Sequence, residues 1–273
     1  MSVIKYKNPE TGKWESIKAI RGEDGAPGRD ARIIAQPTPP EDTSVLWVDT
    51  GDDTVGDAEI SNPLFGKFLA LNGDSICAGS GETLGGYGKI IADRNHMAYQ
   101  NIAKGGATIT AELYSSTTGD PYHWISRTVE NLDETADYII VEGGVNDYWK
   151  PAPLGTISDD FGSALDDSTF YGAFESMLKK LLARFPGKKI GYIIVHKTYA
   201  QGMWRGGDYH TAAVACCEKW GVPYLDLSLL VPPFAHIPSM RSVYTTNDDG
   251  THPTVEGYNK FYCDKIEAWL KTL

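Results

Sequence analysis

Basic residues, long apolar runs and leader-like segments are scarce in this sequence. Lysine and arginine number 25 against 36 aspartate and glutamate residues, so the formal net charge is −11. Such a charge argues against nucleic acid or an anionic membrane as the main partner, because both attract basic surfaces. No apolar run approaches the length of a membrane-spanning helix, and the N-terminus has no apolar core of a signal peptide. We therefore expect a soluble globular protein that is cytoplasmic when made and is not inserted in a membrane.

Signals for cofactors are scarce as well. The four cysteines show no metal-ligand spacing, and the adjacent pair Cys216 and Cys217 favours a reduced state. The glycines form neither the dinucleotide-binding nor the phosphate-loop pattern. Five of the six histidines share no spacing that would suit a metal site: His96, His123, His196, His210 and His236. We expect neither a metal nor another cofactor.

Residues 1–60 differ in character from the rest of the chain. Residues 3–20 alternate around a turn at residues 8–12, which predicts a small β-hairpin, and residues 44–49 are typical of one short strand. Between them, residues 22–30 hold three Gly-X-Y triplets, and a triple helix requires glycine at every third position. Three triplets are too few for a stable triple helix, so a flexible linker is the favoured interpretation and a triple helix is the alternative.

This N-terminal region resembles the attachment segments of phage tail and baseplate proteins. The resemblance rests on the succession of hairpin, Gly-X-Y triplets, the Pro-rich residues 36–40 and a short strand. It implies an attachment or oligomerisation segment and an association with a phage particle. The triplets also suggest a homo-oligomer formed through this segment.

From residue 61 to residue 273, strand patterns alternate with helix patterns. Five short, mostly apolar runs predict strands: residues 67–71, 99–102, 138–142, 189–196 and 223–227. Apolar residues at helical spacing predict helices over residues 169–185, over residues 209–220 and from residue 255 to the C-terminus. The alternation predicts an α/β fold with three layers and a mostly parallel five-stranded sheet. Ligands of such folds bind outside the carboxyl ends of the strands.

Four segments carry polar groups at or near that edge of the predicted sheet. Residues 73–75 offer a serine hydroxyl, Gly106 offers a bare backbone N–H, and Asn146 offers a side-chain amide. Near the C-terminus, Asp249 and His252 offer a carboxylate and an imidazole. A serine hydroxyl becomes a good nucleophile only when a base takes its proton and a carboxylate orients that base. The four segments together therefore predict nucleophilic catalysis.

Each segment also has an ordinary structural interpretation. Ser75 taken alone is more typical of a helix cap than of a nucleophile. Gly106 suits a plain turn, and Asn146 with Asp147 suits an Asx-turn or a helix cap. Asp248 is an alternative to the next residue as the orienting carboxylate. The chemical interpretation is favoured because all four segments occur in one chain, each in a place where the fold could bring it to the same edge.

Residues 66–273 resemble the SGNH (GDSL-type) hydrolase family, because the four segments occur in family order with plausible spacing. The resemblance implies an SGNH/flavodoxin-like fold. It implies that Ser75 is the nucleophile, His252 the general base and Asp249 the acid that orients the base. It also implies an oxyanion hole of three donors: the backbone N–H of Ser75, the backbone N–H of Gly106 and the side-chain amide of Asn146.

The substrate is less closely defined by the sequence. Aromatic residues in the loops at the expected edge, Tyr148, Trp149 and Trp204, suit the apolar faces of sugar rings and equally suit an acyl chain. We expect a serine esterase that acts on a small-molecule or glycan ester with a short acyl group, in the first place O-acetyl groups on carbohydrate. The alternatives are a lysophospholipase or thioesterase of the same fold, and a non-catalytic glycan-binding tail adhesin.

Overall fold

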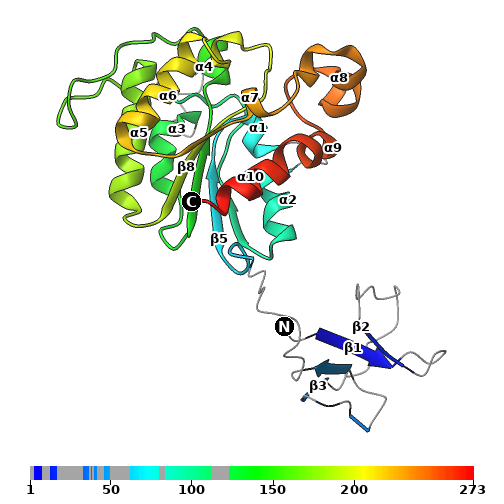
Figure 1. Ribbon diagram of the computed structural model, residues 1–273. Coiled ribbons are helices and arrows are strands. Elements are labelled where there is room, and N and C mark those ends of the chain that lie inside the picture. The colour runs from blue at the N-terminus through cyan, green and yellow to red at the C-terminus, as the bar shows by residue number, and fades with distance from the viewer. Residues whose placement is uncertain are drawn as a thin grey trace. The chain divides into compact units, whose positions relative to one another are not determined.

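The structure, a computed structural model, describes most of the C-terminal region and parts of the N-terminal region. The described residues are 3–7, 13–16, 33–36, 38, 40–41, 46–49, 62–79, 84–111 and 123–273. The chain divides into two compact units, Met1–Ser61 and Asn62–Leu273 (Figure 1). Among the described residues, no helix combines the length and the apolar character needed to cross a membrane.

The N-terminal unit contains a four-stranded sheet with the order β2-β1-β4-β3. Its strands are β1 (Val3–Lys7), β2 (Trp14–Ser16), β3 (Ile33–Gln36) and β4 (Leu46–Asp49). Strands β1 and β2 pair antiparallel, as the predicted hairpin requires, whereas the parallel pairing of β3 with β4 was not predicted. The Gly-X-Y triplets at residues 22–30 lie outside the described residues, so linker and triple helix both stay predictions.

The C-terminal unit is built on a five-stranded sheet with the order β6-β5-β7-β8-β9. Its strands are β5 (Phe68–Asn72), β6 (Ala98–Asn101), β7 (Tyr138–Glu142), β8 (Lys189–Ile194) and β9 (Tyr224–Asp226). All four pairings are parallel, which confirms the predicted α/β fold. All five residues of β7 are buried, because helices cover both faces of the sheet.

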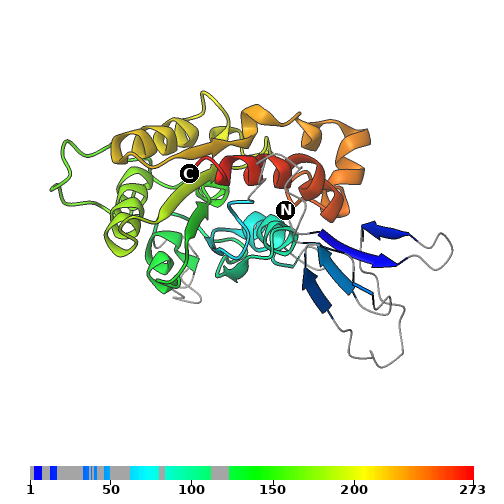
Figure 2. The ribbon, with the colours of Figure 1, turned by 60° about the horizontal axis from the view of Figure 1, so that its bottom comes forward.

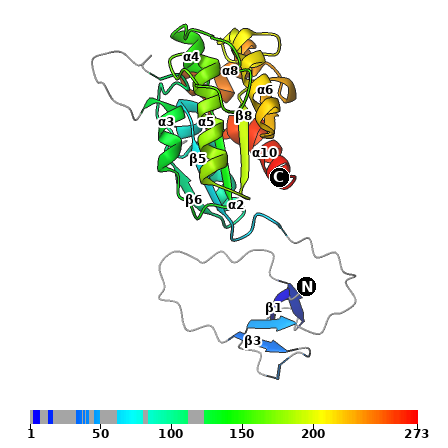
Figure 3. The ribbon, with the colours of Figure 1, turned by 90° about the vertical axis from the view of Figure 1, so that its left-hand side faces the viewer.

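Helices lie on the two faces of this sheet and complete the three layers. One face carries α3 (Ile125–Thr128), α5 (Phe170–Arg184) and α6 (Asp208–Trp220), which turn toward the viewer in Figure 3. The other face carries α2 (Gly86–Arg94) and the C-terminal helix, which lie side by side in Figures 1 and 2. The remaining short elements are α1 (Ser75–Ala78), η3 (Val129–Asn131), α4 (Val145–Trp149), η4 (Gln201–Met203), α7 (Leu227–Leu230), η5 (Phe234–His236), α8 (Pro238–Tyr244) and η6 (Thr246–Asp248).

The C-terminal helix differs from the uniform helix that was predicted. It starts as α9 (Val255–Gly257), continues as the π-helix η7 (Tyr258–Cys263) and ends as α10 (Asp264–Leu270). Within the π-helix, the Tyr258 hydroxyl donates to the carbonyl oxygen of Ile76 over 2.7 Å. The wider turn thus lets a buried tyrosine bond to the backbone of α1, the helix that begins at Ser75.

Candidate active site

Ser75 is the first residue of α1 and directly follows the tight turn at the carboxyl end of β5, a central strand of the sheet. The residue before it, Asp74, is the cap of α1, and its Oδ1 accepts the backbone N–H of Ile76 over 2.9 Å. Gly73 is needed for the close approach, since a Cβ there would lie 2.9 Å from the carbonyl oxygen of Glu142. Capping therefore does not account for Ser75, because Asp74 already supplies the cap.

Ser75, His252 and Asp249 form one continuous hydrogen-bonded chain. His252 Nε2 lies 2.8 Å from Ser75 Oγ, and His252 Nδ1 lies 2.6 Å from Asp249 Oδ2. The second oxygen of the carboxylate, Asp249 Oδ1, accepts the backbone N–H groups of Thr251 and His252 over 2.8 and 2.9 Å. The carboxylate is thereby fixed, and with a proton on Nδ1 the free lone pair of Nε2 faces the serine hydroxyl.

The alternative carboxylate, Asp248, is engaged elsewhere. Both of its oxygens accept from the Arg241 guanidinium, over 2.7 Å from Nε and 3.1 Å from Nη2. These hydrogen bonds lower the pKa of Asp248 below its ordinary value. Asp248 has a left-handed backbone with φ of 59°. Asp249, and not Asp248, therefore contacts the His252 ring.

The glycine loop after β6 lies against the Ser75 turn. The Lys104 N–H donates to the carbonyl oxygen of Gly73 over 3.0 Å, and a Cβ at Gly105 would lie 3.9 Å from Ser75 Cβ. Gly106 itself has a φ of 75°, a conformation that favours glycine. Among the described residues, none accepts the backbone N–H of Gly106. The loop therefore presents a free donor close to Ser75.

Asn146 lies at the start of α4, in the segment that follows β7. Its Nδ2 donates to the carbonyl oxygen of Ala107 over 3.0 Å, which ties the amide to the glycine loop. A side-chain amide carries two N–H groups, so one is left for an oxyanion. The structure thus brings the segments of Ser75, Gly106 and Asn146 together.

Two residues that support this arrangement were not predicted. Asp147 is fully buried and its carboxylate accepts the backbone N–H groups of Ile109 and Thr110, each over 2.9 Å. These bonds span nearly 40 residues, so the alternative of an Asx-turn or helix cap does not describe the Asp147 side chain. Lys150 Nζ donates to the carbonyl oxygen of Gly106 over 3.2 Å. No local sequence motif predicts either contact, because the partners of both side chains are backbone groups far away in the sequence.

The three aromatic candidates differ in exposure. Trp149 is 54% exposed and meets the Tyr148 ring edge-on, with ring centroids 5.3 Å apart. Tyr148 is half-buried against Tyr209, with ring centroids 6.2 Å apart, and the half-buried Trp204 meets the His236 ring edge-on at 4.9 Å. A further aromatic residue, Tyr199, is 37% exposed and packs on the loop that bears His252. Of these four aromatic residues, Trp149 and Tyr199 are thus the most exposed.

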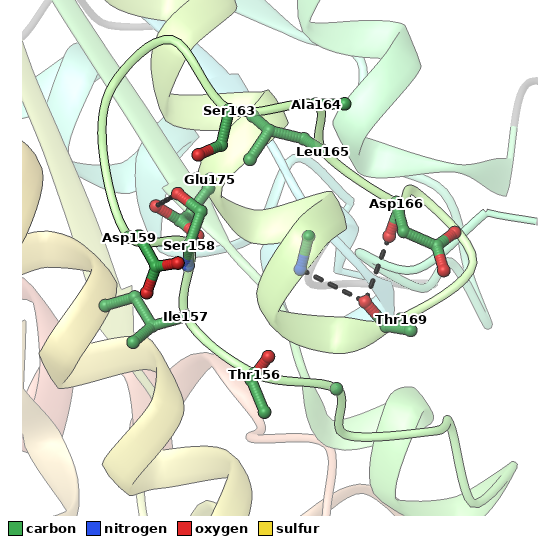
Figure 4. A pocket seen from close by; sticks show the side chains of 12 residues that line it. Thr156, Ile157, Ser158, Asp159, Ser163, Ala164, Leu165, Asp166, Thr169 and Glu175 are labelled. Atoms are coloured by element: carbon green, nitrogen blue, oxygen red, sulfur yellow. Dashed lines mark hydrogen bonds between the residues drawn. The ribbon is translucent and has the colours of Figure 1, made fainter.

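Several cavities in the described part of the chain lie outside the triad, and two of them are the larger ones. A polar cavity of about 370 Å³ opens between the loop after α4 and the start of α5, where Ser158 binds the buried carboxylate of Glu175 (Figure 4). A second cavity of about 390 Å³ is lined by residues of α1, α2 and β6, among them Gly79, Tyr99 and Asn101. Ser75, Asp249 and His252 line neither of them.

Competing chemistry finds little support in the described residues. Among them, no group of three or more histidine, cysteine, aspartate or glutamate side chains is placed to hold a metal ion. Cys77, two residues after Ser75, is fully buried, and burial raises the pKa of its thiol well above the ordinary value. A thiol in that environment stays protonated and is a poor nucleophile.

Comparison with known proteins points in one direction. Residues 71–260 match the model of the GDSL-like lipase/acylhydrolase family. The crystal structure of a Lactobacillus plantarum protein is 27% identical, covers 76% of this chain and 98% of its own, and has a TM-score of 0.61. No curated protein matches the chain by sequence.

Two esterases of known structure share the fold at lower identity. An active-site mutant of a family two carbohydrate esterase from Clostridium thermocellum is 16% identical, with 76% of this chain and 63% of that chain covered and a TM-score of 0.51. An acetyl xylan esterase from Butyrivibrio proteoclasticus is 15% identical, with 77% and 65% covered and a TM-score of 0.50.

Proposed function

Because the chain belongs to the GDSL-like lipase/acylhydrolase family, we propose that it is a serine esterase that works through an acyl-enzyme at Ser75. The observation that carries the proposal is the hydrogen-bonded chain from Ser75 through His252 to Asp249. A serine that is only structural has no need of an imidazole at 2.8 Å whose other nitrogen is held by a carboxylate.

The proposed reaction has two halves. Ser75 Oγ attacks the ester carbonyl carbon while His252 Nε2 takes the hydroxyl proton and Asp249 stabilises the imidazolium. The tetrahedral intermediate then collapses, the C–O bond to the alcohol breaks, and His252 returns the proton to the departing alkoxide. In the second half, water replaces Ser75 as the nucleophile, and the acid leaves with regeneration of the serine.

The negative charge of the intermediate needs donors that are already in place. Ser75 N–H, Gly106 N–H and the Asn146 amide are proposed for this role. Loss of one such donor costs about 3 kcal/mol of transition-state stabilisation in serine hydrolases. The donor of Ser75 is well suited, because it is the first N–H of α1 and has no acceptor within the helix.

We propose that the substrate is an ester with a short acyl group, with O-acetyl carbohydrate as the first candidate. The site is open, since the side chains of His252 and Asp249 are each 35% exposed. Exposed aromatic faces at Trp149 and Tyr199 suit sugar rings. The carbohydrate esterase and the acetyl xylan esterase that share the fold supply the reason to test acetylated glycans first.

A fluorophosphonate probe and an ester panel test both parts of this proposal. We expect the probe to label the wild-type protein and not Ser75→Ala, with Ser163→Ala as the matched control that keeps its labelling. The panel consists of acetyl-xylan, acetylated pectin and p-nitrophenyl esters of increasing chain length. A preference for long acyl chains would favour a lysophospholipase or thioesterase, and absence of labelling in all three proteins would favour a glycan-binding adhesin.

We also propose that residues 1–60 form an attachment or oligomerisation segment, associated with a phage particle. The support is the resemblance of this region to phage tail segments and the presence of three Gly-X-Y triplets. Light scattering of the full chain should give a trimer, and a chain that starts at residue 62 should give a monomer. The same number of chains per particle in the two samples would contradict the oligomerisation role.

A further inference from the structure

Two buried carboxyl groups lie directly behind Ser75. Asp74 and Glu142 both have no exposed surface. Asp74 Oδ1 is satisfied by the N–H of Ile76, but among the described residues Asp74 Oδ2 and both carboxyl oxygens of Glu142 have no partner with hydrogen-bond geometry, although the backbone N–H of Cys77 lies near Glu142. Buried polar atoms are nearly always hydrogen-bonded, and an unpaired buried carboxylate is especially unfavourable. These three oxygens therefore require an explanation.

The two carboxyl groups come from neighbouring strands. Asp74 follows β5 by two residues, and Glu142 is the last residue of β7, which pairs with β5. The strands that carry them approach closely, since a Cβ at Gly73 would lie 2.9 Å from the carbonyl oxygen of Glu142, and the two carboxyl groups interact with each other. Two ionised carboxylates are both acceptors and repel at that separation, whereas a proton on one of them makes a short, favourable hydrogen bond.

The surroundings of the pair supply little compensating charge. The titratable groups that face it from the packed elements are Cys77, Tyr87, Asp147, Tyr192, His252, Tyr258 and Tyr262. Of these, only His252 can carry a positive charge. Burial and the mutual repulsion raise the pKa of Glu142 well above its ordinary value, and burial raises the pKa of Asp74 to about 6.

We propose that Glu142 is a positioning residue for the nucleophile: it stays protonated at neutral pH and donates a hydrogen bond to Asp74 Oδ2. Asp74 then remains a carboxylate with both oxygens satisfied, and it caps α1 and holds the turn that carries Ser75. Glu142 touches neither the substrate nor the triad. The Glu142 proton thus takes the place of the positively charged partner that the buried Asp74 carboxylate would otherwise need.

The proposal fixes the sign of a pH dependence. A carboxyl group whose pKa is higher in the folded than in the unfolded state binds a proton on folding. Its contribution to stability is complete below the unfolded value of about 4.3 for glutamate and is lost as the pH rises through the folded value. In Glu142→Gln, an amide N–H donates to Asp74 without any bound proton, so this loss disappears.

The test compares thermal unfolding of the wild type, Glu142→Gln and Glu142→Leu between about pH 5 and about pH 9. The wild-type Tm should fall relative to that of Glu142→Gln by about 3–5 °C for each pH unit while the wild-type glutamate stays protonated. Glu142→Leu removes the donor and leaves Asp74 Oδ2 unpaired. Its kcat should fall below that of Glu142→Gln with little change in KM, so rescue by glutamine separates a hydrogen bond from simple packing.

Glu175→Gln is the matched control. Glu175 is equally buried, but its oxygens accept from Lys219, Trp220 and Ser158. Those donors lower the pKa of Glu175, so this glutamate is ionised and its replacement by glutamine should reduce the Tm near neutral pH. The two Glu→Gln substitutions are thus expected to have opposite signs.

Infrared spectroscopy of the carboxyl carbonyl stretch gives a readout that needs neither activity nor stability. Near neutral pH, the protonated-carboxyl band should be present in the wild type and in Glu175→Gln, and absent in Glu142→Gln. A band that survives Glu142→Gln, or a Tm that falls in Glu142→Gln as it does in Glu175→Gln, would overturn the proposal. Neither result would affect the esterase proposal, which depends on labelling of Ser75.

Discussion

Replacing Asp249 by asparagine tests whether this carboxylate orients His252 in the proposed catalytic chain. Asp249 Oδ1 accepts two backbone N–H groups, and the amide oxygen of the substituted side chain can keep both. The amide NH₂ then faces His252 Nδ1 in place of Oδ2 and donates to it. The imidazole must therefore carry its proton on Nε2, which points at Ser75 and can no longer accept the serine proton.

The expected loss follows from this tautomer change. In a buried serine protease triad the same substitution lowers kcat by about 10⁴, which corresponds to about 5.4 kcal/mol. Asp249 and His252 are each 35% exposed, so water competes with the carboxylate and we expect a loss between about 10² and 10⁴. The Tm should change little, because the backbone contacts of the side chain are retained.

Asp248→Asn is the control for this experiment. It makes the same chemical change one residue earlier, on a carboxylate that binds Arg241 and not His252. The assay is kcat/KM on p-nitrophenyl acetate, together with fluorophosphonate labelling rates. Retention of activity within about tenfold in Asp249→Asn, or an equal loss in Asp248→Asn, would refute the assignment of the orienting role.

Three further predictions follow from the packing around the site. Asn146→Ala should lower kcat by about 10²–10³ with a small effect on KM, since the role proposed for the amide is stabilisation of the transition state. A raised KM with unchanged kcat, measured on the same ester, would contradict this role. Lys219→Met leaves the buried carboxylate of Glu175 without its closest cation and should cost about 3 kcal/mol in urea unfolding near neutral pH. Because the pKa of Glu175 is lowered, this contribution is present above the ordinary glutamate value and is lost as the pH falls through the folded value, so the difference from wild type should shrink in acid. Gly88→Ala would put a Cβ 2.1 Å from Leu71 Cδ1 and should destabilise the protein by about 1–3 kcal/mol. Gly162→Ala would put a Cβ 3.4 Å from Asp160 Oδ1 and should cost less in the same unfolding assay.

The sheet was predictable because its strands are short apolar runs separated by helix patterns. Strand β7 begins and ends where the sequence pattern predicts, and β8 ends two residues early because the chain turns away after Ile194. Parallel strands place their carboxyl ends at one edge, so the alternation alone predicts that Ser75 and Asn146 lie close together. Helix α2 escaped prediction because Gly85, Gly86 and Gly88 are typical of a loop.

The contacts that complete the site were harder to predict from the sequence. Asp147, Lys150 and the π-helical turn act on backbone groups that lie far away along the chain, and no local pattern encodes such a contact. The sequence could not separate Asp248 from Asp249 because both are aspartates near His252. The difference arises from the left-handed backbone at Asp248, which places that side chain against Arg241.

Glu142 shows how a functional requirement can be hidden inside an apolar strand. Glu142 is the last residue of β7, a strand whose residues are buried on either face of the sheet, and an ionised carboxylate would be unfavourable there. The strand tolerates glutamate only if the carboxyl group is neutral or paired, and Asp74 provides a partner that needs a proton. The two strands approach closely at the Gly73 turn, since a Cβ there would lie 2.9 Å from the Glu142 carbonyl oxygen. The close approach at the turn before Ser75 also brings the Asp74 and Glu142 side chains near each other, and the proton proposed for Glu142 follows from that placement.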